Sequence, residues 1–354
     1  MAKTLKELGA ALDEIRKNSK DFGVPIARMS MTDDAKLAIQ NGELMTFETN
    51  EVSRGQLASL TEIPKTYFDR LASENKSLLA SNVNHALARE ASLNPSDRRM
   101  IRTVGGKVRA VLSNRYRRID SFDLLQETLP VLLDSKFKIE SCEITDRRVY
   151  VKAITDKIQG EVQRGDVVQY GVTISNSDVG MGSLRIEPFL FRLLCSNGMI
   201  GEDKFSARHL GREMTDDDSD VTYFTEETLV ADSRAVILKA RDTLLGTMKQ
   251  ENFDKEIRRM QAATGMKVES PKLDKVVELA CNFFKVTNQE VKRNIFDAFM
   301  SGNEGAGLTA WGLANSFTAA AKSLSDYDEA TRLQRIGYEV IDLNPSQWRS
   351  IACA

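Results

Sequence analysis

The sequence has little of the side-chain chemistry on which metal sites and nucleophilic catalysis depend. Its 354 residues include two histidines, His85 and His209, and four scattered cysteines at positions 142, 195, 281 and 353. A structural zinc site needs closely spaced Cys and His ligands, and a Ser-His-Asp or Cys-His mechanism needs a histidine beside its nucleophile. We therefore predict no metal and no other cofactor, and we expect the cysteines to be reduced thiols.

Long apolar runs are also missing. No stretch approaches the roughly 20 apolar residues of a membrane helix, and the N-terminal residues MAKTLKELGAALDEIRKN are amphipathic and mixed in charge, unlike a signal peptide. The composition, with 42% hydrophobic and 28% charged residues, is that of a globular protein. We expect a cytoplasmic protein with no membrane partner, and the sequence shows no evident small-molecule substrate.

The sequence pattern divides the chain into three parts. Residues 1–95 predict a helical segment with one small β-hairpin at Asn41-Gly42, because Asn-Gly is a strong hairpin signal. Residues 96–212 predict a β-rich core that contains a basic hairpin. Residues 213–354 predict an acidic connector, with seven acids between Glu213 and Glu227, followed by a helical region.

The predicted fold class is α+β: a mostly antiparallel sheet with a packed helix, flanked by a helical N-terminal segment and a helical C-terminal region. Strands are expected at 99–104, 107–113, 136–144, 147–154, 167–175 and 183–195. The packed helix follows Asp120, and Pro130 should kink or nearly end it. After residue 225 the pattern is helical, with one long segment over 233–261.

Two short predicted helices between residues 56 and 71 follow one another closely enough to suggest a helix-turn-helix. The turn of that motif usually takes a glycine, and this sequence has Glu62 there. We expect a packing pair of helices more than a DNA-reading element.

Positive charge is concentrated in one segment, although the whole chain has 49 basic and 51 acidic residues. Eight Arg or Lys residues, no acid and one tyrosine lie between Asp97 and Asp120. A two-residue turn at Gly105-Gly106 would place Arg102 opposite Arg109 on one face of a hairpin. Like charges directly opposed destabilise a strand pair, so we expect either the protein's own carboxylates or an external polyanion to compensate them.

Guanidinium groups bind phosphates, and an aromatic ring among them can stack on a base. We therefore predict that this segment binds nucleic acid. The predicted contact residues are Arg98, Arg99, Arg102, Lys107, Arg109, Arg115, Tyr116, Arg117 and Arg118. The competing interpretation is that these arginines form ion pairs within the chain, as basic clusters often do.

A weaker pattern suggests metal-dependent phosphodiester hydrolysis, which needs clustered carboxylates and a nearby lysine. Glu202, Asp203 and Lys204 form an acid-x-Lys triplet, with Asp178 and Glu187 upstream as candidate metal ligands. Such triplets occur by chance throughout a charged protein. A metal-dependent nuclease is accordingly our third hypothesis, and we expect no catalytic site.

Three blocks of the sequence are distinctive: RAVLSNRYRRIDSFDLLQETLPVL, VTISNSDVGMGSLRIEPFLFRLLCSNGMI and GLTAWGLANSFT. They resemble, in the same order, the signature blocks of phage/plasmid-like proteins grouped as domain of unknown function 932. QLASLTEIPKTYFDRL also resembles the family's pattern, so the resemblance extends from about residue 50 to 330. It implies a protein of phages, plasmids or integrated elements in a bacterial host, often encoded near recombination or anti-defence genes.

A basic hairpin and a sheet backed by one helix are similar, at the level of fold, to single-strand annealing recombinases of the Red-beta, Erf and RecT kind. The similarity implies a non-enzymatic protein that binds single-stranded DNA as a homo-oligomer, with strand annealing during recombination as its further expected role. The alternative is a protein-interaction factor of a mobile element, anti-defence or regulatory, that does not bind DNA.

Overall fold

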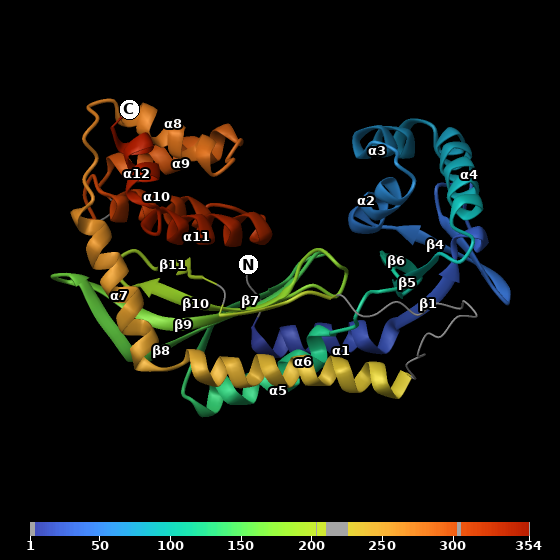
Figure 1. Cartoon of the computed structure of the whole chain (residues 1–354), viewed down its shortest axis with the longest axis horizontal. Coiled ribbons are helices and arrows are strands. Elements are labelled where there is room, and N and C mark those ends of the chain that lie inside the picture. The colour runs from blue at the N-terminus through green and yellow to red at the C-terminus, as the bar shows by residue number, and fades with distance from the viewer. Residues whose placement is uncertain (1–3, 203, 210–225, 303–305, 354) are drawn as a thin grey trace.

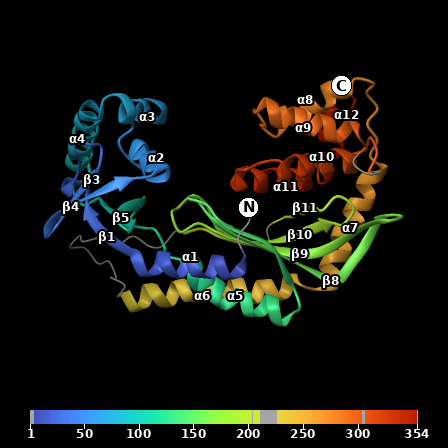
Figure 2. The same ribbon diagram turned by 180° about the vertical axis from the view of Figure 1, so that it is seen from behind.

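The chain folds into a central sheet with a lobe above each of its two ends. The structure, a computed structural model, describes residues 4–202, 204–209, 226–302 and 306–353. Its helices and its two antiparallel-rich six-stranded sheets confirm the predicted α+β class. Figure 1 shows the N-terminal lobe and the C-terminal helices on the same side of the central sheet, and Figure 2 shows this arrangement from behind. No helix in the described part of the chain is long and apolar enough to cross a membrane.

The N-terminal lobe contains a six-stranded sheet in the order β1-β5-β6-β4-β3-β2. The strands are β1 (Ser19–Pro25), β2 (Met29–Met31), β3 (Leu37–Asn41), β4 (Glu43–Thr49), β5 (Arg98–Val104) and β6 (Lys107–Ser113). The hairpin at Asn41-Gly42 and the basic hairpin β5–β6 are both present, as predicted. The basic hairpin pairs with β1 and β4, so it belongs to this lobe and not to the central sheet.

Three helices pack on this sheet through an apolar core. They are α2 (Glu51–Leu60), α3 (Lys65–Glu74) and α4 (Lys76–Leu93). The predicted helix pair α2–α3 buries Leu57, Phe68 and Leu71 in that core. Between the two helices Glu62 has a φ of 56°, the left-handed conformation for which glycine is favoured. The pair is a packing element of the lobe, as expected.

The central sheet has the order β11-β10-β9-β8-β7, and β12 pairs with β10. Its strands are β7 (Lys138–Ile144), β8 (Val149–Gln163), β9 (Asp166–Asn176), β10 (Leu184–Arg192), β11 (Asn197–Ile200) and β12 (Phe205–Ala207). One face is apolar, with Val151, Ile174 and Ile186 fully buried, and it packs on three helices that run along it in Figure 1. These helices are α1 (Leu5–Asn18), α5 (Ser121–Asp134) and α6 (Glu226–Thr247).

Two predicted helices differ from those observed. Pro130 does not end α5, which continues to Asp134 because Leu132, beyond the proline, is buried against the sheet. The segment over 233–261, predicted as one helix, is divided between α6 and α7 (Gln250–Gly265). At the break, Tyr170 donates a hydrogen bond of 3.0 Å to the Thr247 carbonyl, which replaces the partner lost at the helix end.

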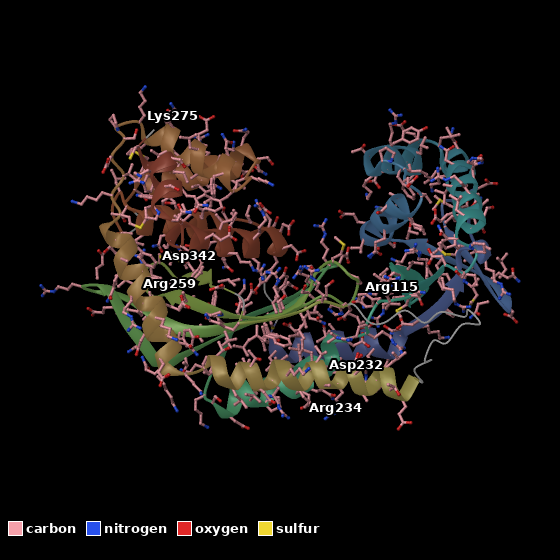
Figure 3. All side chains as sticks on the ribbon, viewed as in Figure 1. Arg115, Asp232, Arg234, Arg259, Lys275 and Asp342 are labelled. Atoms are coloured by element: carbon pink, nitrogen blue, oxygen red, sulfur yellow. The ribbon has the colours of Figure 1, made fainter. Side chains whose placement is uncertain are left out.

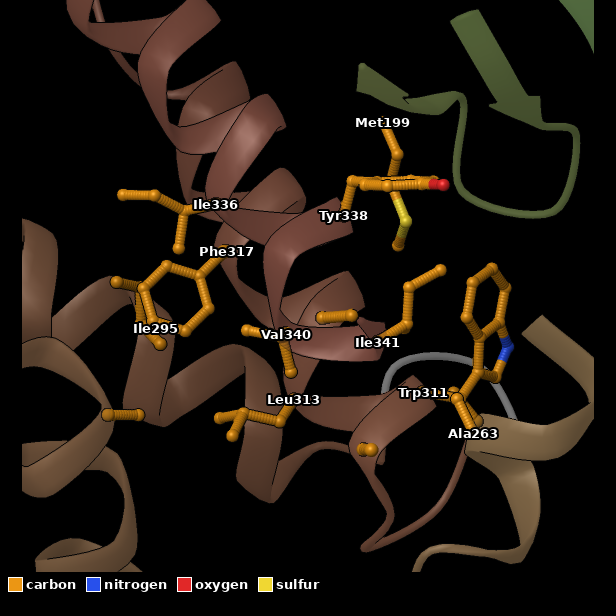
Figure 4. Packing of buried hydrophobic residues seen from close by; sticks show 14 of the residues in the cluster. Met199, Ala263, Ile295, Trp311, Leu313, Phe317, Ile336, Tyr338, Val340 and Ile341 are labelled. Atoms are coloured by element: carbon orange, nitrogen blue, oxygen red, sulfur yellow. The ribbon is translucent and has the colours of Figure 1, made fainter. Parts of the chain in front are cut away.

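The C-terminal region is a helical bundle on the other face of the sheet. It comprises α8 (Leu273–Phe283), α9 (Gln289–Met300), α10 (Ala310–Lys322), α11 (Tyr327–Ile341) and α12 (Pro345–Ala352). Every residue of α10 from Ala310 to Thr318 is buried, so this helix is the centre of the bundle. Figure 4 shows Trp311, Leu313 and Phe317 of α10 among apolar side chains of the neighbouring elements.

A buried ion pair joins this bundle to the sheet. The Arg192 Nε lies 2.6 Å from Asp166 Oδ1, and both side chains are 2% exposed. Trp311 Nε1 donates a 2.9 Å hydrogen bond to the other oxygen, Asp166 Oδ2. One carboxylate on β9 therefore connects β10 to α10.

We expect Asp166→Asn to lower the free energy of unfolding by about 3–5 kcal/mol, because it leaves a buried guanidinium without its carboxylate. Asp156→Asn is the matched control, since Asp156 pairs with Lys138 at an exposed position on the same sheet, where an ion pair contributes little to stability. Denaturant unfolding of both variants measures the difference, and equal losses would contradict the prediction.

Candidate functional site

The basic segment borders a cavity of about 750 Å³ between the N-terminal lobe and the helices α5 and α6. Six of the nine residues predicted to bind nucleic acid line it: Arg98, Arg99, Arg115, Tyr116, Arg117 and Arg118. Arg234 of α6 brings a sixth guanidinium to this arginine-lined cavity. Figure 3 shows Arg115 above Asp232 and Arg234 of α6. Arg102, Lys107 and Arg109 are not among the lining residues.

The predicted register of the basic hairpin is wrong beyond its first two pairs. Val104 pairs with Lys107 and Thr103 with Val108, as expected, but Arg102 pairs with Ala110. A β-bulge takes Arg109 out of register, so that Val108 and Ala110 point to opposite faces of the hairpin, and each is buried in a different apolar cluster. Arg102 therefore does not face Arg109, and the like-charge pair that was expected to require a compensating anion does not form.

Arg102 is neutralised within the chain. Its side chain lies 3.0 Å from Asp21 Oδ1 and 2.7 Å from Asp120 Oδ1, and it donates a 2.9 Å hydrogen bond to the Asp178 carbonyl. Burial alone would lower the pKa of Arg102, but Asp120, Asp21 and Asp178 together raise it above its ordinary value. With 8% of its surface exposed, Arg102 connects β5 to β1, α5 and the end of β9 and is not offered to a ligand.

The side chain of Tyr116 also makes its contacts within the chain. Its hydroxyl donates a 2.8 Å hydrogen bond to the Ser177 carbonyl, and its ring stacks on His209 with centroids 5.0 Å apart. His209 lies between the Arg117 carbonyl at 3.1 Å and the Asn176 Oδ1 at 3.0 Å, and burial lowers the pKa of its imidazole to about 4. These contacts fix the loop 114–118 and leave the Tyr116 ring little surface for a base.

Arg117 and Arg99 of the cavity each pair with one carboxylate. Arg117 lies 2.7 Å from Asp232, and Arg99 lies 2.6 Å from Asp97. Arg98 donates a 3.0 Å hydrogen bond to the Gly23 carbonyl, and Arg115 is exposed. The acidic residues that line the cavity are Asp21, Asp120, Asp123, Glu127 and Asp232. Two of them, Asp21 and Asp120, are paired with Arg102, so the cavity is mixed in charge.

The candidate metal ligands do not come together. Asp178 Oδ1 accepts hydrogen bonds of 3.0 and 2.6 Å from the backbone and hydroxyl of Ser121, so it caps the N-terminus of α5. Glu187 pairs with Arg335, and Lys204 lies 3.5 Å from Glu256. Within the described residues, no group of three or more His, Cys, Asp or Glu side chains could bind a metal ion.

Two predicted features fall wholly or partly outside the described residues. Asp203, the middle residue of the acid-x-Lys triplet, is one of them. The other is the acidic connector, of which residues 213–225 lie outside the described part of the chain and Glu226 and Glu227 begin α6.

A buried polar patch, which the sequence pattern did not predict, lies on the second face of the central sheet, beneath α11. Strand pairing aligns Tyr150 with Ser175 and Arg185 in one row, and Lys152 with Thr173 and Glu187 in the next. We call these six residues the polar sheet face. Five of the six are buried, and all but Arg185 are less than 3% exposed. Alternating polar residues in β8, β9 and β10 were the available signal, but such alternation ordinarily indicates a solvated face.

Side chains from α11 bind this face. Arg335 makes two hydrogen bonds to Glu187, of 2.7 and 2.6 Å, and Tyr150 donates a 2.7 Å hydrogen bond to Asp328. The Lys152 Nζ donates to Gln334 Oε1 at 2.6 Å and lies 4.4 Å from the centroid of the Tyr327 ring. Burial and the nearby Arg335 lower the pKa of Lys152 to about 7.

Lys152 should make stability depend on pH. Its ordinary pKa is 10.5, so between pH 7 and 9 the folded chain binds fewer protons at this site than the unfolded chain. The free energy of unfolding should therefore rise across this window, by about 2 kcal/mol. Lys152→Met should remove that rise, whereas Lys138→Met, at an exposed position on β7, should keep it. Denaturant unfolding at several pH values tests this, and an unchanged slope in Lys152→Met would contradict it.

Arg102 supports a second prediction. Arg102→Gln should lower the free energy of unfolding by about 2–4 kcal/mol, because Asp21 and Asp120 lose their counter-charge. Lys107→Gln, in the exposed turn of the same hairpin, should change it by less than about 0.5 kcal/mol. Thermal and denaturant unfolding compare the two, and an Arg102→Gln variant as stable as wild type would show that the ion pairs are dispensable.

A comparison of the sequence with protein families shows which of these features lie in a shared domain. The model for a family described as a domain of unknown function (DUF932) matches residues 108–335. The loop 114–118 and the polar sheet face lie within this range, whereas Arg98, Arg99, Arg102 and the helix pair at 56–71 lie before it. No curated protein and no solved structure matches the chain, so the likeness to annealing recombinases stays a prediction. Because the match covers more than half of its length, the chain belongs to the DUF932 family.

Proposed function

We propose that this protein binds single-stranded nucleic acid, without catalysing a reaction on it, in the arginine-lined cavity. The observation that supports the proposal is the convergence of six arginines from three segments, β5, the loop 114–118 and α6, on one concave site. Guanidinium groups gathered in this way suit the closely spaced phosphates of a nucleic-acid strand. In a protein of a phage or another mobile element, DNA is the expected polymer and recombination the expected process.

A phosphate group can compete with the carboxylate partners of the cavity arginines. Asp232, the partner of Arg117, is about half exposed, and ion pairs of this kind contribute about 0–1 kcal/mol. A phosphate group can replace such a partner at little cost. Arg102 differs because it is buried and has two carboxylate partners. The proposed contact residues are therefore Arg98, Arg99, Arg115, Arg117 and Arg118, and Arg102 and Tyr116 support the loop that carries three of them.

The shape and the mixed charge of the site favour a single strand bound weakly by each copy. Duplex DNA is usually read by a helix or strand inserted into a groove, whereas a flexible single strand can follow a concave surface. The acids among the arginines limit the affinity of one site. Several copies of the protein along one strand would raise the overall affinity, and for this reason we include homo-oligomerisation in the proposal.

Fluorescence anisotropy with a labelled single-stranded oligonucleotide tests the proposal. Arg115→Glu combined with Arg118→Glu should weaken binding at least tenfold, because two phosphate contacts become repulsive. Arg293→Glu on α9, where the side chain is 83% exposed, is the matched control and should leave binding unchanged. Wild-type affinity should fall steeply with salt and should be lower for the matching duplex. Absence of binding at low salt, or an equal loss in the control, would refute the proposal.

One observation favours a second function. Arg102 has its carboxylate partners within the chain, and the acids of the cavity nearly balance its arginines. If the remaining pairs are equally persistent, the basic segment is structural and the protein acts through a protein partner, as an anti-defence or regulatory factor of a mobile element. Oligonucleotide binding would then be negligible at physiological salt, and Arg115→Glu with Arg118→Glu would lower stability instead of affinity.

A further inference from the structure

We propose that the polar sheet face, together with Arg148 and Arg335, forms a second binding site whose ligand is a phosphate group. The guanidinium groups of Arg148, Arg185 and Arg335 would bind its charge, and the hydroxyls of Thr173 and Ser175 would bind its remaining oxygens. None of the residues that line the arginine-lined cavity takes part. The inference therefore does not depend on nucleic-acid binding in that cavity.

Three buried polar atoms on this face have no hydrogen-bond partner among the described residues. They are Thr173 Oγ1, Ser175 Oγ and Arg148 Nη1. Both hydroxyl side chains are completely buried, and strand pairing directs them to the face that carries Lys152, Glu187 and Arg185. Buried polar groups in proteins are almost always hydrogen-bonded, and leaving one unbonded is costly. Three such atoms on this face indicate a bound group that forms hydrogen bonds with them.

Several positively charged side chains lie close together on this face. Burial lowers the pKa of Arg148, and the neighbouring positive charges of Arg335 and Arg185 lower it further. Glu187 is already bound by Arg335 and lies 3.8 Å from Arg185. Asp328 accepts a hydrogen bond from Tyr150. The guanidinium groups of Arg148, Arg185 and Arg335 and the Lys152 amine thus lie on this face together with the carboxylates of Glu187 and Asp328. Glu143 pairs with Tyr150 from the neighbouring strand β7.

Arg148 is held in place for such a contact. Its Nη2 donates a 2.9 Å hydrogen bond to the Met181 carbonyl. A Cβ atom at Gly182 would lie 2.1 Å from Arg148 Cζ, so the absence of a side chain at residue 182 makes room for the guanidinium. A positioned guanidinium loses less conformational entropy when it binds a ligand than a mobile one.

The donor set fits a phosphate group better than a carboxylate. A phosphate has three or four acceptor oxygens in a tetrahedral arrangement, whereas a carboxylate has two in one plane. Three guanidinium groups and two hydroxyls, from β9, β10, α11 and the residue before β8, can satisfy the larger number. Both inorganic phosphate and the phosphate of a nucleotide have this chemistry, and the experiment must separate them.

Isothermal titration of the full chain with inorganic phosphate at constant ionic strength is the first test. We expect saturable binding at millimolar phosphate and a rise in the melting temperature over that in chloride. Ser175→Ala should weaken phosphate binding about tenfold or more, because it removes a hydrogen bond to a charged group. The same variant without phosphate should be as stable as wild type or more stable, because a buried unbonded hydroxyl is gone.

Arg185→Met provides a test at a position that is one-third exposed, and it too should weaken phosphate binding at least tenfold. Arg147→Met is the matched control. Arg147 precedes Arg148 in the chain, but its side chain pairs with Glu51 at an exposed position, so phosphate binding should be unchanged. Absence of phosphate binding by wild type would overturn the inference, and so would equal losses in Arg147→Met and Arg185→Met.

Two further titrations identify the source of the phosphate group. A deoxynucleoside 5′-monophosphate that displaces inorganic phosphate and binds at least tenfold more tightly would identify a nucleotide ligand. Weaker binding of the nucleotide than of inorganic phosphate would identify the free anion. Phosphate binding that persists in Arg115→Glu/Arg118→Glu separates this site from the proposed nucleic-acid site, so either proposal can fail while the other stands.

Discussion

The arrangement around the cavity depends on the buried guanidinium of Arg102. Its partners come from three elements: Asp21 on β1, Asp120 at the start of α5, and the Asp178 carbonyl after β9. Asp178 in turn caps α5 through Ser121. Removing a charge from water is costly unless its partners are well placed, so this interaction is favourable only when the N-terminal lobe, α5 and the central sheet are in one specific arrangement. The position of the cavity follows from that arrangement.

The helices on the two faces of the central sheet are held by different kinds of contact. On one face, apolar side chains pack against α1, α5 and α6. On the other, α11 is bound to the polar sheet face by directional contacts such as Glu187–Arg335 and Tyr150–Asp328. Apolar packing tolerates small displacements, whereas hydrogen bonds and ion pairs require specific distances and angles. The polar contacts thus fix the position of α11 along the sheet more narrowly than burial alone would.

Local signals in the sequence predicted the elements but not their partners. β5, β6, α5 and the helical character of the C-terminal region were predicted because periodicity, capping and turn residues are local properties. β1 was missed because SKDFGVP has no clear alternation and becomes a strand by pairing with β5, about 80 residues away. The bulge at Arg109 and the burial of Arg102 depend on distant contacts. The polar sheet face is buried by α11, which lies more than 140 residues after Glu187. No local pattern in the sequence predicts this burial.

The placement of α1 and β1 has a consequence for folding order. α1 packs in the core beneath the central sheet, which includes residues of α6, while β1 directly after it is the edge strand of the N-terminal lobe. A chain emerging from the ribosome therefore cannot complete the packing of its first helix until about residue 244 has been synthesised. Such high contact order predicts slow folding. The N-terminal lobe, whose core lies within residues 22–111, can pack early in synthesis, whereas α1 and the central sheet should reach their native packing late.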